Sequence, residues 1–312
     1  MAARLILHIG TEKTGSTAIQ RFLSSQRDCL FFQGYGVPRS LGAVEHRRFA
    51  LFFYQHEQKD DLTQTEGLDQ LCLQDRKAAI AIWQQEFDEE IARRPDHSWV
   101  VSSEHIHSRI LHNESCLEKM AVYVKERFDE VQIIVYLREP LSAALSLWST
   151  AVLNGAALTD LPLPDNEYWH RLCCHRSTID QLEKWFPGQF RPRLFAPENW
   201  IDGDIIRDFS VATGINLPFD YQTSPQRANT SLSWLSLSLI ARLNREGRPS
   251  RELVKAIRDS FDHLPSPRAN AMQKRAYENA YATSNEWVRQ RYFPSSRCLF
   301  EAPFHDNHLK PS

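Results

Sequence analysis

The chain has 312 residues, of which 42% are hydrophobic and 24% charged, a balance typical of a globular protein that buries a substantial core. Its formal net charge of −2 provides no overall basic field that would favour nucleic acid, so we expect no nucleic-acid partner. No apolar run approaches the roughly 20 residues that span a bilayer and no signal peptide is apparent, so we expect no transmembrane segment. Six scattered cysteines without metal-ligand spacing favour a reducing, cytoplasmic location and predict no metal site.

The N-terminal stretch RLILHIGTEKTGSTAIQRFL, from Arg4 to Leu23, begins as a strand and continues through a short loop into a helix. The apolar run Leu5–Ile9 predicts the strand, and apolar residues at helical spacing predict the helix. Two glycines, Lys13 and four hydroxyl side chains crowd the loop between them. Such a turn directs backbone N–H groups and the positive end of a helix dipole at an anion. A glycine pair alone would fit an ordinary strand-to-helix turn, but the added polar groups predict a phosphate- or sulfate-type anion site at Gly10–Thr17.

Strands and helices alternate along the rest of the chain. Apolar runs predict strands at Ser98–Ser103 and Val131–Leu137. We also expect a short edge strand at Arg193–Phe195. The aromatic, glycine-containing segment Cys29–Ser40 indicates a strand or turn, and the polar segment Glu57–Asp69 indicates a surface loop. The expected helices are Glu45–His56, Asp75–Arg94, a segment capped by Asn113, a segment begun by Pro140, a stretch ending near Phe186, Ile205–Thr213, Ser231–Asn244, Arg251–Phe261 and Asn270–Tyr292. This order predicts an α/β fold with a parallel sheet covered on both faces. We expect one domain, 1–312, with a helical C-terminal portion from roughly residue 205.

The anion loop differs from the phosphate loop of nucleoside triphosphatases. That loop reads GxxxxGK[ST], with its lysine after the second glycine. Here the two glycines keep that spacing, but Lys13 lies inside the loop and Ser16 follows Gly15. A triphosphatase also needs an acidic residue for Mg²⁺ at the end of a later strand, whereas the strand Val131–Leu137 ends in Arg138. The pattern therefore argues against hydrolysis of ATP or GTP.

Two segments resemble the donor-binding motifs of PAPS-dependent sulfotransferases, where PAPS is 3′-phosphoadenylyl sulfate. The segment HIGTEKTGST resembles the loop that binds the 5′-phosphosulfate, and VYLREPLSAALS resembles the strand–loop–helix that binds the 3′-phosphate. In the second segment Arg138 ends the strand, Pro140 follows two residues later, and Ser146 lies eight residues beyond the arginine. The resemblance implies a fold of the P-loop type, in which a central parallel sheet is flanked by helices. It also implies transfer of a sulfuryl group from PAPS to a hydroxyl without a metal, leaving PAP as the product.

The resemblance assigns roles to residues in both segments. The residues expected to bind the donor are Thr11, Lys13, Thr14, Gly15, Ser16, Thr17, Arg138 and Ser146. Lys13 can reach the bridging oxygen, where negative charge develops as the S–O bond breaks. Arg138 can bind the 3′-phosphate through two guanidinium N–H groups, and Ser146 adds a hydroxyl donor.

An acceptor hydroxyl must lose its proton as it attacks sulfur, so the site needs a base. The segment SWVVSSEHIHSR places Glu104, His105 and His107 after a predicted strand. Glu104 is the first choice, because partial burial suits a glutamate to general-base chemistry; His105 is second and His107 third. The structural alternative is that Glu104 caps a helix or pairs with Arg109.

Several alternatives stay open at the level of sequence. Arg227 either closes over the 3′-phosphate or is a solvated residue beside a helix cap at Asn229. The expected acceptor is a hydroxyl on a carbohydrate or glycolipid, with a small metabolite as the other possibility. The alternative functions are a P-loop kinase of a small metabolite and a non-catalytic nucleotide-binding module. The oligomeric state is unknown.

Overall fold

The computed structural model describes residues 4–11, 13–219, 221–222, 232–247 and 249–300. Arg227 and Asn229 lie outside these residues, so their predicted roles are not addressed by the structure. The described chain divides into two compact units. The first comprises Met1–Arg138 with Thr178–Thr230, and the second comprises Glu139–Ser177 with Ser231–Ser312.

The first unit is built on a parallel sheet, as the alternation of strands and helices predicts. Its described strands are β1 (Arg4–Ile9), β2 (Tyr35–Gly36), β3 (Ser98–Ser102), β4 (Glu130–Leu137) and β5 (Phe190–Leu194). They lie in the order β2-β3-β1-β4-β5, and every pair is parallel. β1 is the central strand, which explains why its sequence is an almost continuous apolar run rather than an alternating one. β5 begins earlier than predicted, and Pro192 is tolerated within it because the strand lies at the edge of the sheet.

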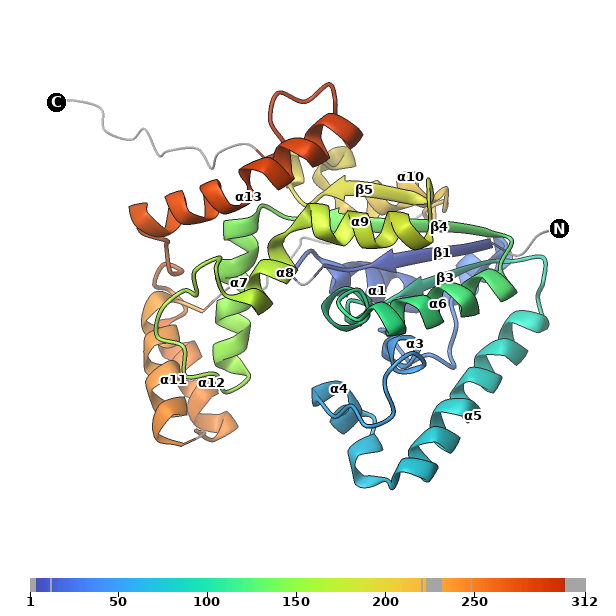
Figure 1. The fold of residues 1–312 in the computed structure, drawn as a ribbon, viewed down its shortest axis with the longest axis horizontal. Helices are drawn as coiled ribbons and strands as arrows, with labels where there is room; N and C mark the ends of the chain where they lie inside the picture. Colours follow the sequence, from blue (N-terminus) through green and yellow to red (C-terminus); the bar gives the residue numbers. More distant parts are fainter. Residues whose placement is uncertain (1–3, 12, 220, 223–231, 248, 301–312) are drawn as a thin grey trace. The chain divides into compact units, whose positions relative to one another are not determined.

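Helices cover the two faces of this sheet (Figure 1). The helices that lie wholly or mostly in the first unit are α1 (Ser16–Ser25), α2 (Arg27–Phe32), α3 (Arg47–Leu51), α4 (Asp61–Thr65), α5 (Leu73–Ala92), α6 (Glu114–Arg127), α9 (His175–Trp185) and α10 (Ile205–Thr213). Ile19 and Phe22 of α1 and Phe209 of α10 pack with Ile6 and Ile134 of the sheet in one buried cluster. α6 and α9 cover the opposite face (Figure 1). The sheet is therefore covered on both faces, and in such a sheet a ligand site is expected at the strand ends.

Two predictions for the segments between β1 and α5 are wrong. The first part of Cys29–Ser40 continues the helix α2 to Phe32, because Leu30 packs into the core in a helical turn, and only the two residues of β2 are extended. The expected loop Glu57–Asp69 contains α4. Asp60 caps this helix by accepting hydrogen bonds from the backbone N–H groups of Leu62 and Thr63.

The second unit is helical. Its helices are α7 (Pro140–Leu153), α8 (Glu167–Cys173), α11 (Trp234–Glu246), α12 (Arg251–Phe261) and α13 (Ala271–Tyr292). Trp148 of α7, Leu237 of α11 and Tyr277 of α13 share one buried cluster, and the Tyr277 hydroxyl donates to the Pro162 carbonyl at 2.7 Å. The helical C-terminal portion is thus confirmed, whereas a single domain over 1–312 stays a prediction. None of the described helices has the length and apolar character needed to cross a membrane.

Candidate active site

The loop between β1 and α1 presents an open helix N-terminus. Gly15 is the N-cap of α1 and has φ 73°, the left-handed region that glycine adopts without strain. No described side chain caps this helix, so its first backbone N–H groups are available to a ligand. A Cβ atom on Gly15 would lie 2.7 Å from Ile205 Cδ1 and 3.0 Å from Phe195 Cε2, so a larger residue would require these side chains to shift. The loop therefore has the geometry of an anion site.

Two buried threonines brace this loop from within. The Thr14 hydroxyl donates to the Thr11 carbonyl at 2.6 Å, and the Thr11 hydroxyl donates to the Tyr136 carbonyl of β4 at 2.7 Å. Both hydroxyl protons are therefore used inside the protein, whereas Thr17 is exposed. Binding of the sulfuryl donor by Thr11, Thr14 and Thr17 stays a prediction. Thr11 and Thr14 would contribute through their backbone N–H groups, because their hydroxyl protons are already used.

The two motifs that were singled out in the sequence meet at the end of the sheet. Arg138 directly follows β4, and its Nη1 donates to the backbone carbonyl of Lys13 at 2.7 Å. The guanidinium carbon of Arg138 lies 5.4 Å from the centroid of the Phe195 ring, which adds a cation–π contact. Lys13 itself has φ 68°, an uncommon conformation for a lysine that the Arg138 contact helps to hold. Lys13 and Arg138 thus lie together beside the candidate anion loop.

Glu104 lies beside the same loop. The Ser16 hydroxyl, on the first residue of α1, donates to Glu104 Oε2 at 2.7 Å. A Cβ atom on Gly10 would lie 2.8 Å from Ser16 Cβ and 3.4 Å from Glu104 Cβ, so the end of β1 passes closely between these two residues. The alternative pairing with Arg109 does not occur, because Arg109 binds Asp60 and Asp61 instead. Glu104 is thereby placed at the open end of α1.

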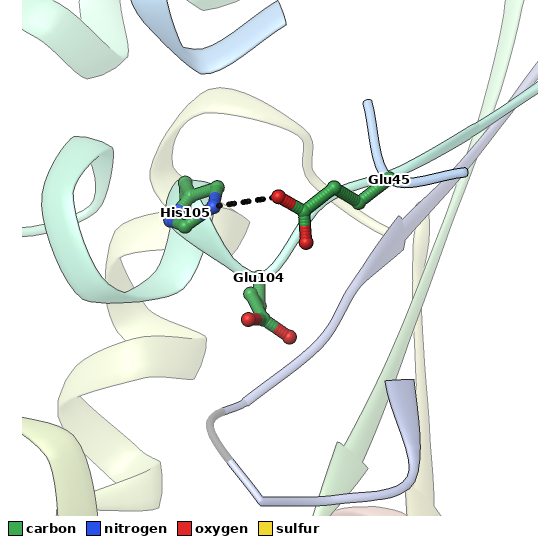
Figure 2. Close-up of side chains that lie close together, drawn as sticks. All are labelled: Glu45, Glu104 and His105. Atoms are coloured by element: carbon green, nitrogen blue, oxygen red, sulfur yellow. Dashed lines mark ion pairs between the residues drawn. The ribbon is translucent and has the colours of Figure 1, made fainter. Parts of the chain in front are cut away.

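The sequence reasoning missed Glu45. His105 Nε2 lies 3.8 Å from Glu45 Oε1, and one polar atom each from Glu45, Glu104 and His105 lies within 4.8 Å of the other two. Figure 2 shows the Glu45 carboxylate directed at the His105 ring, with the Glu104 carboxylate pointing away from that pair. The facing His105 side chain lowers the pKa of Glu45, although partial burial opposes this effect. No sequence signal marked Glu45, because it lies outside the two motifs and far from His105 along the chain.

The third choice of base, His107, lies deeper in the protein. It is 1% exposed, and its Nε2 lies 3.3 Å from the Thr178 hydroxyl. It belongs to a short π-helical segment, Ile106–Ile110, that begins directly after His105. Segments of this kind are frequent at functional sites. Here His107 lies within the segment and is buried, whereas His105 directly precedes it and is partly exposed.

Two buried histidines hold the end of β3 that leads into Glu104. His8 Nδ1 lies 2.8 Å from the Ser102 hydroxyl, and the Ser102 backbone N–H donates to His46 Nδ1 at 3.0 Å. Both rings are fully buried, and burial lowers the pKa of each to about 3. Neutral imidazoles at these positions therefore fix the strand end that presents the base candidate.

Ser146 belongs to the second unit. It is buried on α7, and its carbonyl accepts a hydrogen bond from the Thr150 hydroxyl at 3.2 Å. Its predicted contact with a 3′-phosphate stays a prediction.

The cluster of Glu45, Glu104 and His105 has the donor types of a metal site. Arg47, however, forms an ion pair with Glu45 Oε1 at 2.5 Å, which supplies a positive charge to that oxygen without a metal. The expectation of no metal stays untested.

Comparisons with known proteins give likenesses only among solved structures. The chain is similar to a sulfotransferase from Alicyclobacillus acidocaldarius, with 15% identity over 82% of this chain and 100% of that one and a TM-score of 0.43. It is also similar to the sulfotransferase domain of the Synechococcus PCC 7002 olefin synthase, with 12% identity over 90% and 94% of the two chains and a TM-score of 0.36. A third likeness is to the sulfotransferase domain from the curacin biosynthetic pathway, with 11% identity over 90% and 98% and a TM-score of 0.37.

Neither a family model nor a curated protein matches the chain. At identities this low and TM-scores below 0.5, we base no functional conclusion on the three likenesses. The function is argued from the residues of the site.

Proposed function

We propose that the protein is a sulfotransferase that moves the sulfuryl group of PAPS to an acceptor hydroxyl. The observation that carries the proposal is the 2.7 Å hydrogen bond between the Ser16 hydroxyl and the Glu104 carboxylate. It joins the first residue of an open helix N-terminus to a carboxylate at the end of a neighbouring strand. An anion held by the helix would therefore lie next to a group able to take a proton.

The residues of the loop fit the 5′ end of such a donor. The N–H groups at the start of α1 and the exposed Thr17 hydroxyl are suited to the 5′-phosphate. Among the described residues, no side chain forms an ion pair with Lys13, which suits it to the bridging oxygen. A cation already in place there stabilises the charge that develops as the S–O bond breaks.

Glu104 is the proposed general base. Its Oε2 accepts the Ser16 hydroxyl, which leaves Oε1 to take the proton of the acceptor. PAPS supplies an activated sulfuryl group: the acceptor oxygen bonds to sulfur, and the electron pair of the breaking S–O bond stays with PAP. Arg138, whose Nη1 donates to the Lys13 carbonyl, is the proposed ligand of the 3′-phosphate, and Ser146 is the proposed second donor.

The acceptor that we propose is a hydroxyl of a carbohydrate or glycolipid, with a small metabolite as the other class. This rests on the type of reaction, and no described residue selects between the two classes. A cytoplasmic location stays a prediction.

Labelled PAPS tests the proposal. We expect PAP to form in the presence of a panel of mono- and disaccharides, and Lys13→Ala to reduce its rate at least 100-fold. Glu104→Gln should reduce the rate by about 10²- to 10⁴-fold, the usual contribution of a general base. Glu118→Gln, which alters an exposed carboxylate on α6, serves as the matched control and should leave the rate unchanged. Equal rates in Glu104→Gln and Glu118→Gln would remove Glu104 from the mechanism.

A second function, phosphoryl transfer from ATP, has one observation in its favour. A carboxylate hydrogen-bonded to a hydroxyl at the start of α1 could ligate Mg²⁺ beside a triphosphate. The position of Lys13 within the loop argues against this function, since the lysine of a triphosphate-binding loop follows the second glycine. Tight binding of ATP with Mg²⁺ in the absence of PAP binding would favour the kinase.

A further inference from the structure

Glu45 and His105 form a contact that the proposed mechanism does not yet use. The two side chains are 25% and 13% exposed, so water screens their interaction only partly. Glu45 directly precedes His46, and the backbone N–H of His46 donates to the Ser102 carbonyl at 3.0 Å. The segment that carries Glu45 is thus anchored to the end of β3, two residues before Glu104. This anchoring gives the carboxylate a defined position against the ring.

The two nitrogens of the His105 ring have different surroundings. Nε2 faces the Glu45 carboxylate at 3.8 Å, whereas Nδ1 is buried and has no hydrogen-bond partner among the described residues. A carboxylate can only accept, so it favours a proton on the nitrogen that faces it. With the proton on Nδ1 instead, the Nε2 lone pair would face a carboxylate that cannot donate to it. The contact with Glu45 therefore places the proton of the neutral ring on Nε2.

We propose that Glu45 is a positioning residue that holds the His105 ring with its proton on Nε2. In this tautomer Nε2, the nitrogen on the side of the cluster, is already protonated and cannot accept a proton from an acceptor hydroxyl. The role of base therefore belongs to Glu104, whose carboxylate points away from the Glu45–His105 pair (Figure 2). Only this last step rests on the proposed function, because the tautomer is a property of the free protein.

A neighbouring glutamate supplies a matched control. Arg47 binds Glu45 Oε1 at 2.5 Å and also lies 3.7 Å from Glu66 Oε1. Glu66 is half-buried like Glu45, but its ion pairs are with Arg47 and Arg48. Removing either glutamate costs Arg47 an ion pair, and only removal of Glu45 changes what faces His105.

The test is the ¹⁵N spectrum of the histidine rings in the full chain, recorded at alkaline pH, where imidazole is neutral. Long-range ¹H–¹⁵N correlations show which ring nitrogen carries the proton, and His105→Gln assigns the signal by its loss. We expect the Nε2–H tautomer in the unmodified protein and in Glu66→Ala, and a mixture of both tautomers in Glu45→Ala. A proton on Nδ1 in the unmodified protein, which requires no variant to fold, overturns the proposal. An unchanged tautomer in Glu45→Ala also overturns it.

A second measurement separates this inference from the proposed function. Glu45→Ala should keep the affinity of the unmodified protein for PAP, because Glu45 lies outside the anion loop. Turnover of PAPS should fall less than tenfold in His105→Gln and about 10²- to 10⁴-fold in Glu104→Gln. A larger fall in turnover in His105→Gln than in Glu104→Gln would make His105 the base. Absence of PAP binding in the unmodified protein would contradict the proposed function and leave the tautomer result as it stands.

Discussion

Acidification should destabilise the first unit through two buried histidines, His8 and His46. His8 and His46 are fully buried and hold the end of β3, and burial lowers the pKa of each to about 3. In the unfolded chain an imidazole has its ordinary pKa near 6.5. Above that value both states are neutral and the pair has no pH dependence. As the pH falls below 6.5, these histidines bind protons in the unfolded chain but stay neutral in the folded protein. The free energy of unfolding therefore decreases until the pH reaches about 3.

The size of the effect follows from the two pKa values. Each histidine lowers the free energy of unfolding by about 1.4 kcal/mol for each pH unit below pH 6.5. At pH 5 the loss is therefore about 2 kcal/mol for each ring, and about 4 kcal/mol for both if they act independently. This is a large part of the roughly 5–15 kcal/mol that stabilises a typical domain. Because both rings contact Ser102, the two losses need not add fully.

Urea unfolding at pH 7 and pH 5 measures this loss. The unmodified protein should lose more stability between the two pH values than either His8→Gln or His46→Gln, by about 2 kcal/mol in each comparison. The glutamine side chain can still hydrogen-bond at these positions but does not titrate. His263→Gln, which changes an exposed histidine of the second unit, is the control and should lose as much as the unmodified protein. Equal losses in all four proteins would refute the reasoning.

Two further predictions concern the residues that shape the anion loop and its support. Gly15→Ala should destabilise by about 2–5 kcal/mol in urea unfolding, since it adds left-handed strain and a clash. Gly188→Ala, at φ 72° in open space, should cost only about 1–2 kcal/mol, and equal costs would show that the close contacts of Gly15 are unimportant. Asp208→Asn should destabilise by about 3–5 kcal/mol, because fully buried Asp208 accepts hydrogen bonds from Arg193 and Tyr136. A loss below 1 kcal/mol in the same assay would contradict that buried network.

Much of the fold was predictable because its central elements carry strong local signals. β1 and β4 are apolar runs that end in glycine or arginine, and α10 and α12 were predicted to the residue. The wrong predictions concern short elements. α2 and α4 have six and five residues, too few for a hydrophobic period to be recognised, and α4 depends on a cap rather than on apolar spacing.

The site divides in the same way. Lys13 and Arg138 were predictable because each lies at a strand end in a recognisable motif, and chain ends of parallel strands meet at one edge. Glu45 could not be predicted, because its place beside His105 depends on a long-range contact between His46 and Ser102. The use of the Thr11 and Thr14 hydroxyls inside the loop was hidden for the same reason, since sequence spacing does not show where a hydroxyl points.

The most direct test of the central claim is calorimetric titration of the protein with PAP in the absence of Mg²⁺. We predict saturable binding of PAP, weaker binding of adenosine 5′-monophosphate, and a loss of at least tenfold in PAP affinity in Arg138→Ala. A tenfold loss corresponds to about 1.4 kcal/mol, which is close to the lower end of the range of about 1.5–3 kcal/mol for a hydrogen bond to a charged group. Failure to bind PAP, together with binding of ATP and Mg²⁺, would contradict the account.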